Sequence, residues 1–299
     1  MCAEQSTAKK RHKKINIQPY IFISPLFILF FVSGIYPLFY TIYLAFTQTV
    51  AGNLVFVGLK NFISVTKDRY FLTSCLNTVI FLVVDVNIKL VSSLGIALLL
   101  NKPFKGNFIA KFAMLLVWAA PYVACLWVWG FMLSPYFGVI NNILLGLGII
   151  SKPIPFLSDP DIALYVITLI HVWKAIPFWS IMFLAGLTSI PVHLYESAVV
   201  DGANKFQTFR YITLPQLKNI IIINYVLTTI WTSGEFTSFQ MLTNGGPFYR
   251  TATIPVYAYL SFISTWSYGV PSAALLFVFP FIAFLILAVL RTNMLTLGR

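Results

Sequence analysis

Long stretches without a charged side chain limit what this chain can fold into. Residues 15–59, 112–151 and 251–290 contain no Asp, Glu, Lys or Arg. A helix needs about 20 consecutive, mostly apolar residues to cross the hydrocarbon core of a bilayer, and each stretch is long enough. Hydrophobic residues make up 59% of the chain, which is more than a soluble domain of this length hides in its interior. The sequence therefore predicts an all-α integral membrane protein.

The apolar runs and the polar residues between them divide the chain into six expected transmembrane helices. The fourth is interrupted by His171 and Lys174. On this reading, residues 1–19 form a basic N-terminal segment, and residues 20–299 form one transmembrane domain with a cytoplasmic loop at 191–219. The six helices are expected near residues 20–46, 76–100, 112–133, 162–190, 220–242 and 270–290.

The net charge of +12 is distributed in a way that orients the helices in a membrane. With the N-terminus in the cytoplasm, the excess of basic residues on cytoplasmic segments obeys the positive-inside rule and places both termini on that side. The run KKRHKK is interpreted as facing lipid headgroups rather than nucleic acid. The basic residues on these segments are Lys9, Lys10, Arg11, Lys13, Lys14, Lys102, Lys105, Lys111, Lys205, Arg210, Lys218, Arg291 and Arg299.

Motifs for catalysis, nucleotide binding and metal binding are missing from the sequence. There is no GxxxxGK[ST] phosphate-binding loop, no HExxH and no GxSxG. The three cysteines, Cys2, Cys75 and Cys125, show no metal-binding spacing. We therefore predict no catalytic residue, no metal site and no cofactor bound by this chain.

A polar segment with aromatic side chains, ESAVVDGANKFQTFRYITLP at 196–215, separates two apolar runs on the expected cytoplasmic side. Leu194, Ala198 and Val199 are expected to share one face of a short helix. Gly202 then allows the chain to turn, and two phenylalanines follow. Periodicity alone leaves two readings open: a surface covered by a partner protein, or a connecting loop that lies on the lipid headgroups.

This segment resembles the cytoplasmic signature loop of binding-protein-dependent ABC importer permeases. In that loop Glu-Ala-Ala is followed by Gly and then by Ile-x-Leu-Pro. Here Glu196-Ser197-Ala198, Gly202 and Ile212-Thr213-Leu214-Pro215 match, with Ser197 in place of the middle alanine. Similarity to the maltose and glycerol-phosphate branch extends over nearly the whole chain, at VGLKNF (57–62), LNTVIF (76–81), IALLLN (96–101), FGVINN (137–142), LSDP (157–160), LAGLTSIP (184–191) and LTNGGP (242–247).

The resemblance implies a type I importer permease fold in a prokaryotic cell membrane, with a coupling helix that docks on a separate ATPase subunit. The implied partners are a second, non-identical permease subunit, two ATPase subunits and an extracellular solute-binding protein. ATP and Mg²⁺ would be bound by the ATPases, so this chain is expected to be a transport subunit and not an enzyme. The residues implied for ATPase contact are Glu196, Ala198, Asp201, Gly202, Ala203, Phe206, Phe209, Ile212, Leu214 and Pro215.

Charged residues inside a bilayer are costly, and they generally face a cavity or a partner. Asp85 and Lys89 stand four apart in the second expected helix, in the favourable order for an ion pair on one helix face, and we interpret them as a structural pair. Lys174 and Glu235 leave two readings open. They neutralise each other between two helices, or they face a substrate.

Polar and aromatic side chains of the third, fourth and fifth expected helices are spaced to share faces. Sugar rings carry both CH faces and hydroxyls, so they bind to aromatic rings and a few hydrogen-bonding groups. Alignment with maltose-type permeases implies that a sugar lies among these helices, although most of the aligned side chains differ from the maltose pattern, which favours another sugar. The implied substrate pathway is Trp118, Tyr122, His171, Lys174, Ala175, Trp231, Thr232 and Glu235.

We therefore predict the membrane-spanning permease subunit of an ATP-driven ABC importer for an oligosaccharide or a related polyol derivative. An ion-coupled secondary transporter is the alternative. It predicts acidic residues along a path and an inverted repeat, and neither is clear in the sequence. A membrane-embedded enzyme is a third reading, but the ionisable residues within the spans are scattered over three helices.

Overall fold

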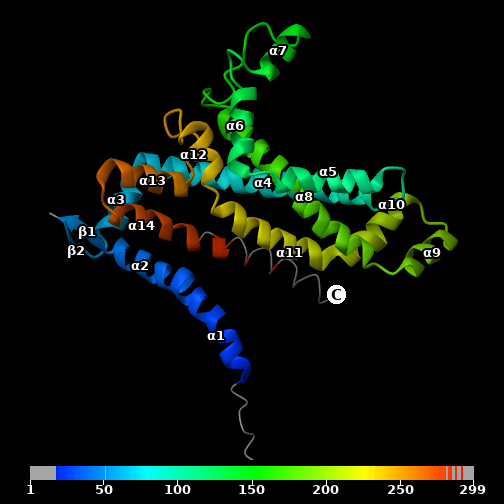
Figure 1. Cartoon of the computed structure of the whole chain (residues 1–299), viewed down its shortest axis with the longest axis horizontal. Coiled ribbons are helices and arrows are strands. Elements are labelled where there is room, and N and C mark those ends of the chain that lie inside the picture. Colours follow the sequence, from blue (N-terminus) through cyan, green and yellow to red (C-terminus); the bar gives the residue numbers. More distant parts are fainter. Residues whose placement is uncertain (1–17, 51, 281, 285–286, 288–290, 292–299) are drawn as a thin grey trace, which may run out of the picture.

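A computed structural model of the chain describes residues 18–50, 52–280, 282–284, 287 and 291. The chain is mostly helical, and its longest helices form an elongated bundle (Figure 1). The predicted all-α fold is confirmed for the described part of the chain. Residues 1–17, which include KKRHKK, and residues 292–299 lie outside it.

The first predicted span is a nearly continuous helix. α1 (Gln18–Phe30), the π-helical turn η1 (Phe31–Ile35) and α2 (Tyr36–Ala45) follow one another directly, in agreement with the expected 20–46. The span points away from the bundle in Figure 1, and α2 packs on α14 (Gly269–Leu276). Its most apolar window has none of its residues buried in this chain, so those side chains are open to lipid or to another subunit.

Three long helices form the centre of the bundle. α4 (Arg69–Leu100) packs along α8 (Ala163–Thr188), and α11 (Leu214–Ser233) packs on both. α4 begins seven residues before the expected start at 76 because the Asp68 carboxylate accepts a hydrogen bond from the backbone amide of Tyr70 and caps the first turn. The three helices share an apolar core of Val86, Leu90, Ala97, Phe183, Leu187, Ile190 and Leu217.

The predicted continuous helix over 112–133 is wrong. It is broken into α5 (Asn107–Ala119) and α6 (Tyr122–Met132), which meet at an angle of 92°. Ala120 takes an extended conformation, with ψ 139°, directly before Pro121. The ring of a proline disfavours the helical conformation of the residue before it, so the helix ends there.

The fifth predicted span is also interrupted, and the sixth lies partly outside the described residues. α11 ends at Ser233, and a short helix, α12 (Thr237–Thr243), follows. α13 (Ile254–Thr265) and α14 then pack on each other. The expected span 270–290 begins within α14, but residues 281, 285–286 and 288–290 lie outside the described part of the chain.

Three described helices are candidates to cross a membrane on their own. In the described residues, Ile21–Ala45, Arg69–Leu100 and Ala163–Thr188 are long and apolar enough to cross a membrane, and the α5–α6 pair is a fourth if it counts as one broken span. The six spans and the cytoplasmic position of both termini therefore stay predictions.

Short elements lie at the two ends of the bundle. α3 (Lys60–Lys67) and the hairpin of β1 (Thr47–Val50) and β2 (Asn53–Phe56) lie at one end, and α9 (Val192–Val200) and α10 (Lys205–Thr208) at the other (Figure 1). α7 (Val139–Gly146) projects beyond α6. A second π-helical turn, η2 (Phe209–Thr213), leads from α10 into α11. The bundle therefore separates the segment 191–219 from the hairpin end.

Candidate functional site: a cavity within the bundle

A cavity of about 230 Å³ lies between α4, the α5–α6 break, α8 and α11. All eight residues predicted for the substrate pathway line it, so the structure brings the whole predicted set together. Most of them lie on α8 and α11, at positions set by helical spacing. The lining consists of Lys89, Trp118, Tyr122, His171, Lys174, Ala175, Phe178, Trp179, Trp231, Thr232 and Glu235.

Aromatic rings form one wall of this cavity. The Trp118 ring stacks on Phe178 with centroids 5.7 Å apart, and the Phe178 centroid is 5.3 Å from that of Trp231. Trp179, which is buried, lies 5.6 Å from Trp231. Trp118 and Trp231 stay 48% and 60% exposed, so their faces remain available to a ligand.

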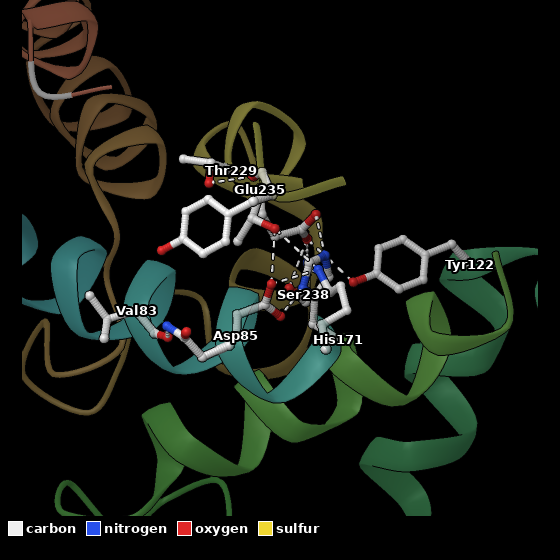
Figure 2. Close-up of polar contacts among 11 residues, drawn as sticks. Val83, Asp85, Tyr122, His171, Thr229, Glu235 and Ser238 are labelled. Atoms are coloured by element: carbon white, nitrogen blue, oxygen red, sulfur yellow. Dashed lines mark hydrogen bonds and ion pairs between the residues drawn. The ribbon is translucent and has the colours of Figure 1, made fainter. Parts of the chain in front are cut away.

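A buried carboxylate organises the polar side of the cavity. Asp85 is fully buried, and its Oδ2 lies 2.5 Å from Nζ of Lys89. The same oxygen accepts a hydrogen bond of 2.9 Å from the Thr232 hydroxyl, and Oδ1 lies 2.6 Å from Nδ1 of His171. The Lys89 ammonium also donates to the Thr232 hydroxyl, at 3.1 Å. Asp85 thus joins α4 to both α8 and α11 (Figure 2).

Glu235 is the second carboxylate of this network. Its Oε1 accepts hydrogen bonds of 2.7 Å from both the amide and the hydroxyl of Ser238, at the start of α12. The Tyr122 hydroxyl donates to the same oxygen at 3.4 Å, and Oε2 lies 3.6 Å from Nε2 of His171. The His171 ring therefore lies between Asp85 and Glu235, as Figure 2 shows.

Lys174 does not pair with Glu235. Its ammonium donates to the backbone carbonyls of Val117, Trp118 and Ala120, at 2.7, 2.9 and 2.6 Å. The last carbonyls of a helix have no partner within the helix, and the negative end of the helix dipole favours a cation there. Lys174 therefore caps the C-terminal end of α5, where the predicted span breaks.

Sequence reasoning missed part of the lining. The Asp85–Lys89 ion pair is confirmed, but both residues also belong to the cavity network, which their spacing did not reveal. Phe178 follows His171 by seven residues and Lys174 by four on α8, so it lies on the same helix face. That spacing was the signal that would have identified Phe178.

The segment 191–219 contains the expected turn. α9 starts after Pro191, and Gly202 has φ +75° with nothing within 4 Å of an added Cβ atom. Asn204 and Gln207 then form a reciprocal capping box at the start of α10. Gly202 is thus the residue at which the two short helices separate.

The exposure of this segment differs from the sequence expectation at one position. Ala198 is buried and Leu194 is half-buried, but Val199 is 73% exposed, so it does not share their face. Val200 and Phe206 are also exposed, at 87% and 74%. Of the ten residues predicted for ATPase contact, Glu196, Asp201, Gly202, Phe206 and Pro215 are exposed, Ala203, Phe209, Ile212 and Leu214 are half-buried, and Ala198 is buried.

A bundle of apolar helices around a polar and aromatic cavity is the architecture of a membrane transport subunit. The chain belongs to the family of binding-protein-dependent transport system inner membrane components, whose pattern matches residues 15–296. It is therefore a multi-pass membrane component of an ABC transporter, and members of this family are transport subunits rather than catalytic ones.

Relatives share about a third of their residues with this chain. The trehalose/maltose transport system permease protein MalF of Thermococcus litoralis is 34% identical over 269 residues, which are 89% of this chain and 90% of the relative. The sulfoquinovosyl glycerol permease SmoG of Agrobacterium fabrum is 33% identical, covering 85% of this chain and 82% of the relative. The lactose permease LacF of Rhizobium radiobacter is 31% identical, covering 90% and 91%.

Solved structures share the fold. A bacterial ABC transporter that imports alginate superposes with a TM-score of 0.81 at 24% identity, covering 93% of this chain and 95% of that one. The bacterial alginate transporter in complex with a pentasaccharide-bound periplasmic protein gives 0.80 at 26% identity, covering 91% and 92%. The permease fold predicted from the sequence is confirmed.

Proposed function

We propose that this chain is the permease subunit of an ATP-driven importer for a sugar, either an oligosaccharide or a related polyol derivative. The relatives named above are permeases for trehalose and maltose, sulfoquinovosyl glycerol and lactose. These compounds share glycosidic rings with many hydroxyls. A substrate of the same chemical class is the simplest one consistent with all of them.

The observation that carries this proposal is the composition of the cavity. Trp118 and Trp231 offer exposed aromatic faces, and Tyr122 and Glu235 offer hydrogen-bonding groups in the same lining, while the buried Thr232 hydroxyl bonds to Asp85 and Lys89. Aromatic faces pack against the CH faces of a sugar ring, and the polar groups bind its hydroxyls. Asp85 and Glu235 balance Lys89 and Lys174 in charge, which suits a neutral substrate.

The size of the cavity requires it to widen during transport. About 230 Å³ is below the roughly 300–1,000 Å³ of a typical ligand pocket. We therefore infer that the cavity holds one part of an oligosaccharide in the conformation seen here. Separation of α4 and α8 from α11 would enlarge it.

The energy for that movement is proposed to come from partner chains. The exposed residues of the segment 191–219 would dock on an ATPase subunit, which binds ATP and Mg²⁺. The complete transporter would contain two ATPases, a second permease subunit and an extracellular binding protein. The periplasmic protein in the alginate transporter complex supports the last of these, and the membrane of a prokaryotic cell is the expected location.

Uptake by the complete transporter tests this function. The probes are radiolabelled maltose, trehalose, lactose and sulfoquinovosyl glycerol, supplied with the cognate binding protein, with ATP inside and the proton gradient collapsed. We expect ATP-dependent uptake of at least one probe, and a loss of about tenfold, or roughly 1.4 kcal/mol, in Trp118→Ala and Trp231→Ala. Trp127→Ala is the matched control, since Trp127 lies 66% exposed on α6 outside the cavity lining.

Uptake that needs the proton gradient and not ATP would overturn the proposal. Equal uptake by all three tryptophan variants would exclude the cavity as the substrate pathway.

A further inference from the structure

The imidazole ring of His171 lies between two carboxylates from different elements. Its Nδ1 lies 2.6 Å from Oδ1 of Asp85 on α4, and its Nε2 lies 3.6 Å from Oε2 of Glu235, which follows the end of α11. The His171 side chain is 14% exposed, that of Glu235 is 13% exposed, and Asp85 is fully buried. We call these three side chains the Asp85–His171–Glu235 bridge, because they connect α4 through α8 to the junction of α11 and α12 (Figure 2).

Both carboxylates of the bridge are surrounded by hydrogen-bond donors. Oε1 of Glu235 accepts from the amide and the hydroxyl of Ser238 and from the Tyr122 hydroxyl. Oδ2 of Asp85 lies against the Lys89 ammonium. An ionised carboxylate only accepts hydrogen bonds, whereas a protonated one also donates. These contacts therefore favour the ionised form of both groups.

Two negative charges in a membrane span require positive partners. The Lys89 ammonium is in contact with Asp85. The Lys174 ammonium instead donates to carbonyls at the C-terminal end of α5, where the helix dipole carries part of its charge. A doubly protonated His171 would supply a cation to both carboxylates, since both nitrogens of the charged ring are donors. In the neutral ring one nitrogen is an acceptor, and it would face a carboxylate oxygen.

The two contacts of the ring depend on its charge to different degrees. The 2.6 Å contact with Asp85 is short enough for a hydrogen bond, and a neutral ring with its hydrogen on Nδ1 can make the same bond. The 3.6 Å contact with Glu235 is too long for a hydrogen bond, so its attraction comes from the charge. Loss of one proton from His171 would therefore keep the bond to Asp85 and remove the attraction to Glu235.

Histidine is the group around this ring that is suited to change charge near neutral pH. Of the residue types present, it is the one that ordinarily does so between about pH 5 and 8. The ring of Phe81 packs on it at 5.5 Å and carries no charge. Among the described residues, the charged and titratable groups near the ring are Asp85 and Lys89 from α4, Tyr122 from α6, Glu235 from the α11–α12 junction and Lys174, one turn away on α8.

We propose that His171 is a proton-dependent positioning residue, whose protonated ring holds Glu235 and the α11–α12 junction against α8. When the pH rises, Nε2 gives its proton to solvent and the junction is released. The cavity widens as α11 separates from α4 and α8, so the protonated bridge should slow that step. The energy still comes from ATP, because this proton does not cross the membrane with the substrate. The inference deepens the proposed function and rests on it.

Thiol labelling tests whether the bridge controls access to the cavity, without knowledge of the substrate. Ala175→Cys lines the cavity, and Lys152→Cys is an exposed control. Both are made in the complete transporter after its native cysteines are replaced. Labelling by a small maleimide is measured at about pH 5.5 and about pH 8, and the ratio of the two rates corrects for ionisation of the thiol.

We expect the ratio of cavity labelling to control labelling to rise about fivefold from the lower to the higher pH, which corresponds to about 1 kcal/mol. In a His171→Gln background the ratio should be the same at both pH values, since glutamine does not take up a proton. A ratio that changes with pH equally in both backgrounds would mean that another group carries the effect, and the inference would fail.

Uptake tests whether the bridge limits transport. A labelled probe sugar is supplied with ATP inside, the same pH on both sides and no proton gradient, over about pH 5.5–8. Uptake by each variant is divided by that of the wild type at the same pH, which removes the pH dependence of the partner chains. We expect this quotient to be about fivefold higher at the lower pH in both His171→Gln and Glu235→Gln. His193→Gln, an exposed histidine on α9, should give a constant quotient whatever its basal rate.

A constant labelling ratio in the wild type, or constant quotients in both bridge variants, would exclude a proton-dependent role for His171. If His171→Gln does not assemble, Glu235→Gln decides alone, and an unaltered pH profile in it would exclude the bridge. Labelling that depends on pH through His171, without import of any probe sugar, would support the bridge and count against the proposed function instead.

Discussion

The ammonium of Lys174 lies 2.6 Å from the carbonyl oxygen of Ala120, the residue at which α5 ends and the chain bends by 92° into α6. Together with the bonds to Val117 and Trp118, this contact joins the middle of α8 to the break in a neighbouring span. Trp118 and Tyr122 lie on either side of that break and both line the cavity. Lys174 therefore holds the backbone of Trp118 directly, and it fixes Ala120, two residues before Tyr122.

Replacement of Lys174 by methionine should disturb the backbone at the α5–α6 break. It should not break an ion pair with Glu235, because the two residues do not form one. Three carbonyls would lose their donor, and an unsatisfied buried polar group costs about 1–3 kcal/mol. We expect a lower unfolding temperature and lower uptake, with partial recovery in Lys174→Arg. Thermal unfolding of the solubilised transporter is the measurement. Recovery in the double reversal Lys174→Glu/Glu235→Lys would instead support an ion pair between these residues.

Neutralising Asp85 should destabilise the bundle strongly. In Asp85→Asn the Lys89 ammonium stays buried without its counter-charge, and breaking a buried ion pair typically costs about 3–5 kcal/mol. Asp85→Leu combined with Lys89→Met should cost less, because no charge remains. Asp161→Asn is the control. Its ion pair with Arg250 spans 3.5 Å, with side chains 80% and 55% exposed, and such surface pairs contribute about 0–1 kcal/mol. Equal destabilisation by Asp85→Asn and Asp161→Asn would contradict the assignment.

Gly202→Val should reduce ATP-driven transport while leaving the membrane-spanning fold intact. A side chain at φ +75° is strained by about 1–3 kcal/mol, which should turn α9 relative to α10. We expect normal membrane insertion and normal pairing with the second permease, but less ATPase co-purified with the complex and proportionally lower uptake. Gly148→Val is the matched control, since Gly148 has φ +68° and equally open surroundings. A full complement of ATPase with Gly202→Val would favour a simple connecting loop.

Gly186→Ala should disturb the packing of α8 on α11. A Cβ atom there would displace the Cδ1 methyl of Ile220, the end of a flexible side chain, and would lie 3.1 Å from the fully buried Leu217, which must shift. The cost should therefore lie at the low end of the about 1–3 kcal/mol typical of overpacking. We expect a lower unfolding temperature. Gly95→Ala on α4, which meets nothing within 4 Å, should leave it unchanged or slightly higher. A neutral Gly186→Ala would mean that the two helices separate easily in the resting state.

Sequence patterns predicted the helices that are long and continuous. The first and fourth spans agree closely with α1–α2 and α8, because uninterrupted apolar runs carry a strong signal. Pro121 lies inside an equally apolar run, and prolines are tolerated in membrane helices. Pro121 therefore indicates where a break can occur, but only the packing around Ala120 shows that the helix bends there.

The sequence predicted which residues line the cavity, but it did not predict the hydrogen bonds and ion pairs between them. Spacing on single helices, supported by family resemblance, identified the eight cavity residues. It did not show that Lys174 bonds to backbone carbonyls. Every residue has a backbone carbonyl, so a sequence does not indicate which of them a side chain will bind.

α11 is a continuous helix from Leu214, within the segment 191–219, to Ser233 beside the cavity. A helix of 20 residues is a stiff rod about 30 Å long, at 1.5 Å per residue. Tilting such a rod by about 10° about one end moves its other end by roughly 5 Å, close to one helical turn. A small rotation beside α10 is thus enough, by leverage alone, to carry Trp231 and Thr232 across the width of a sugar ring.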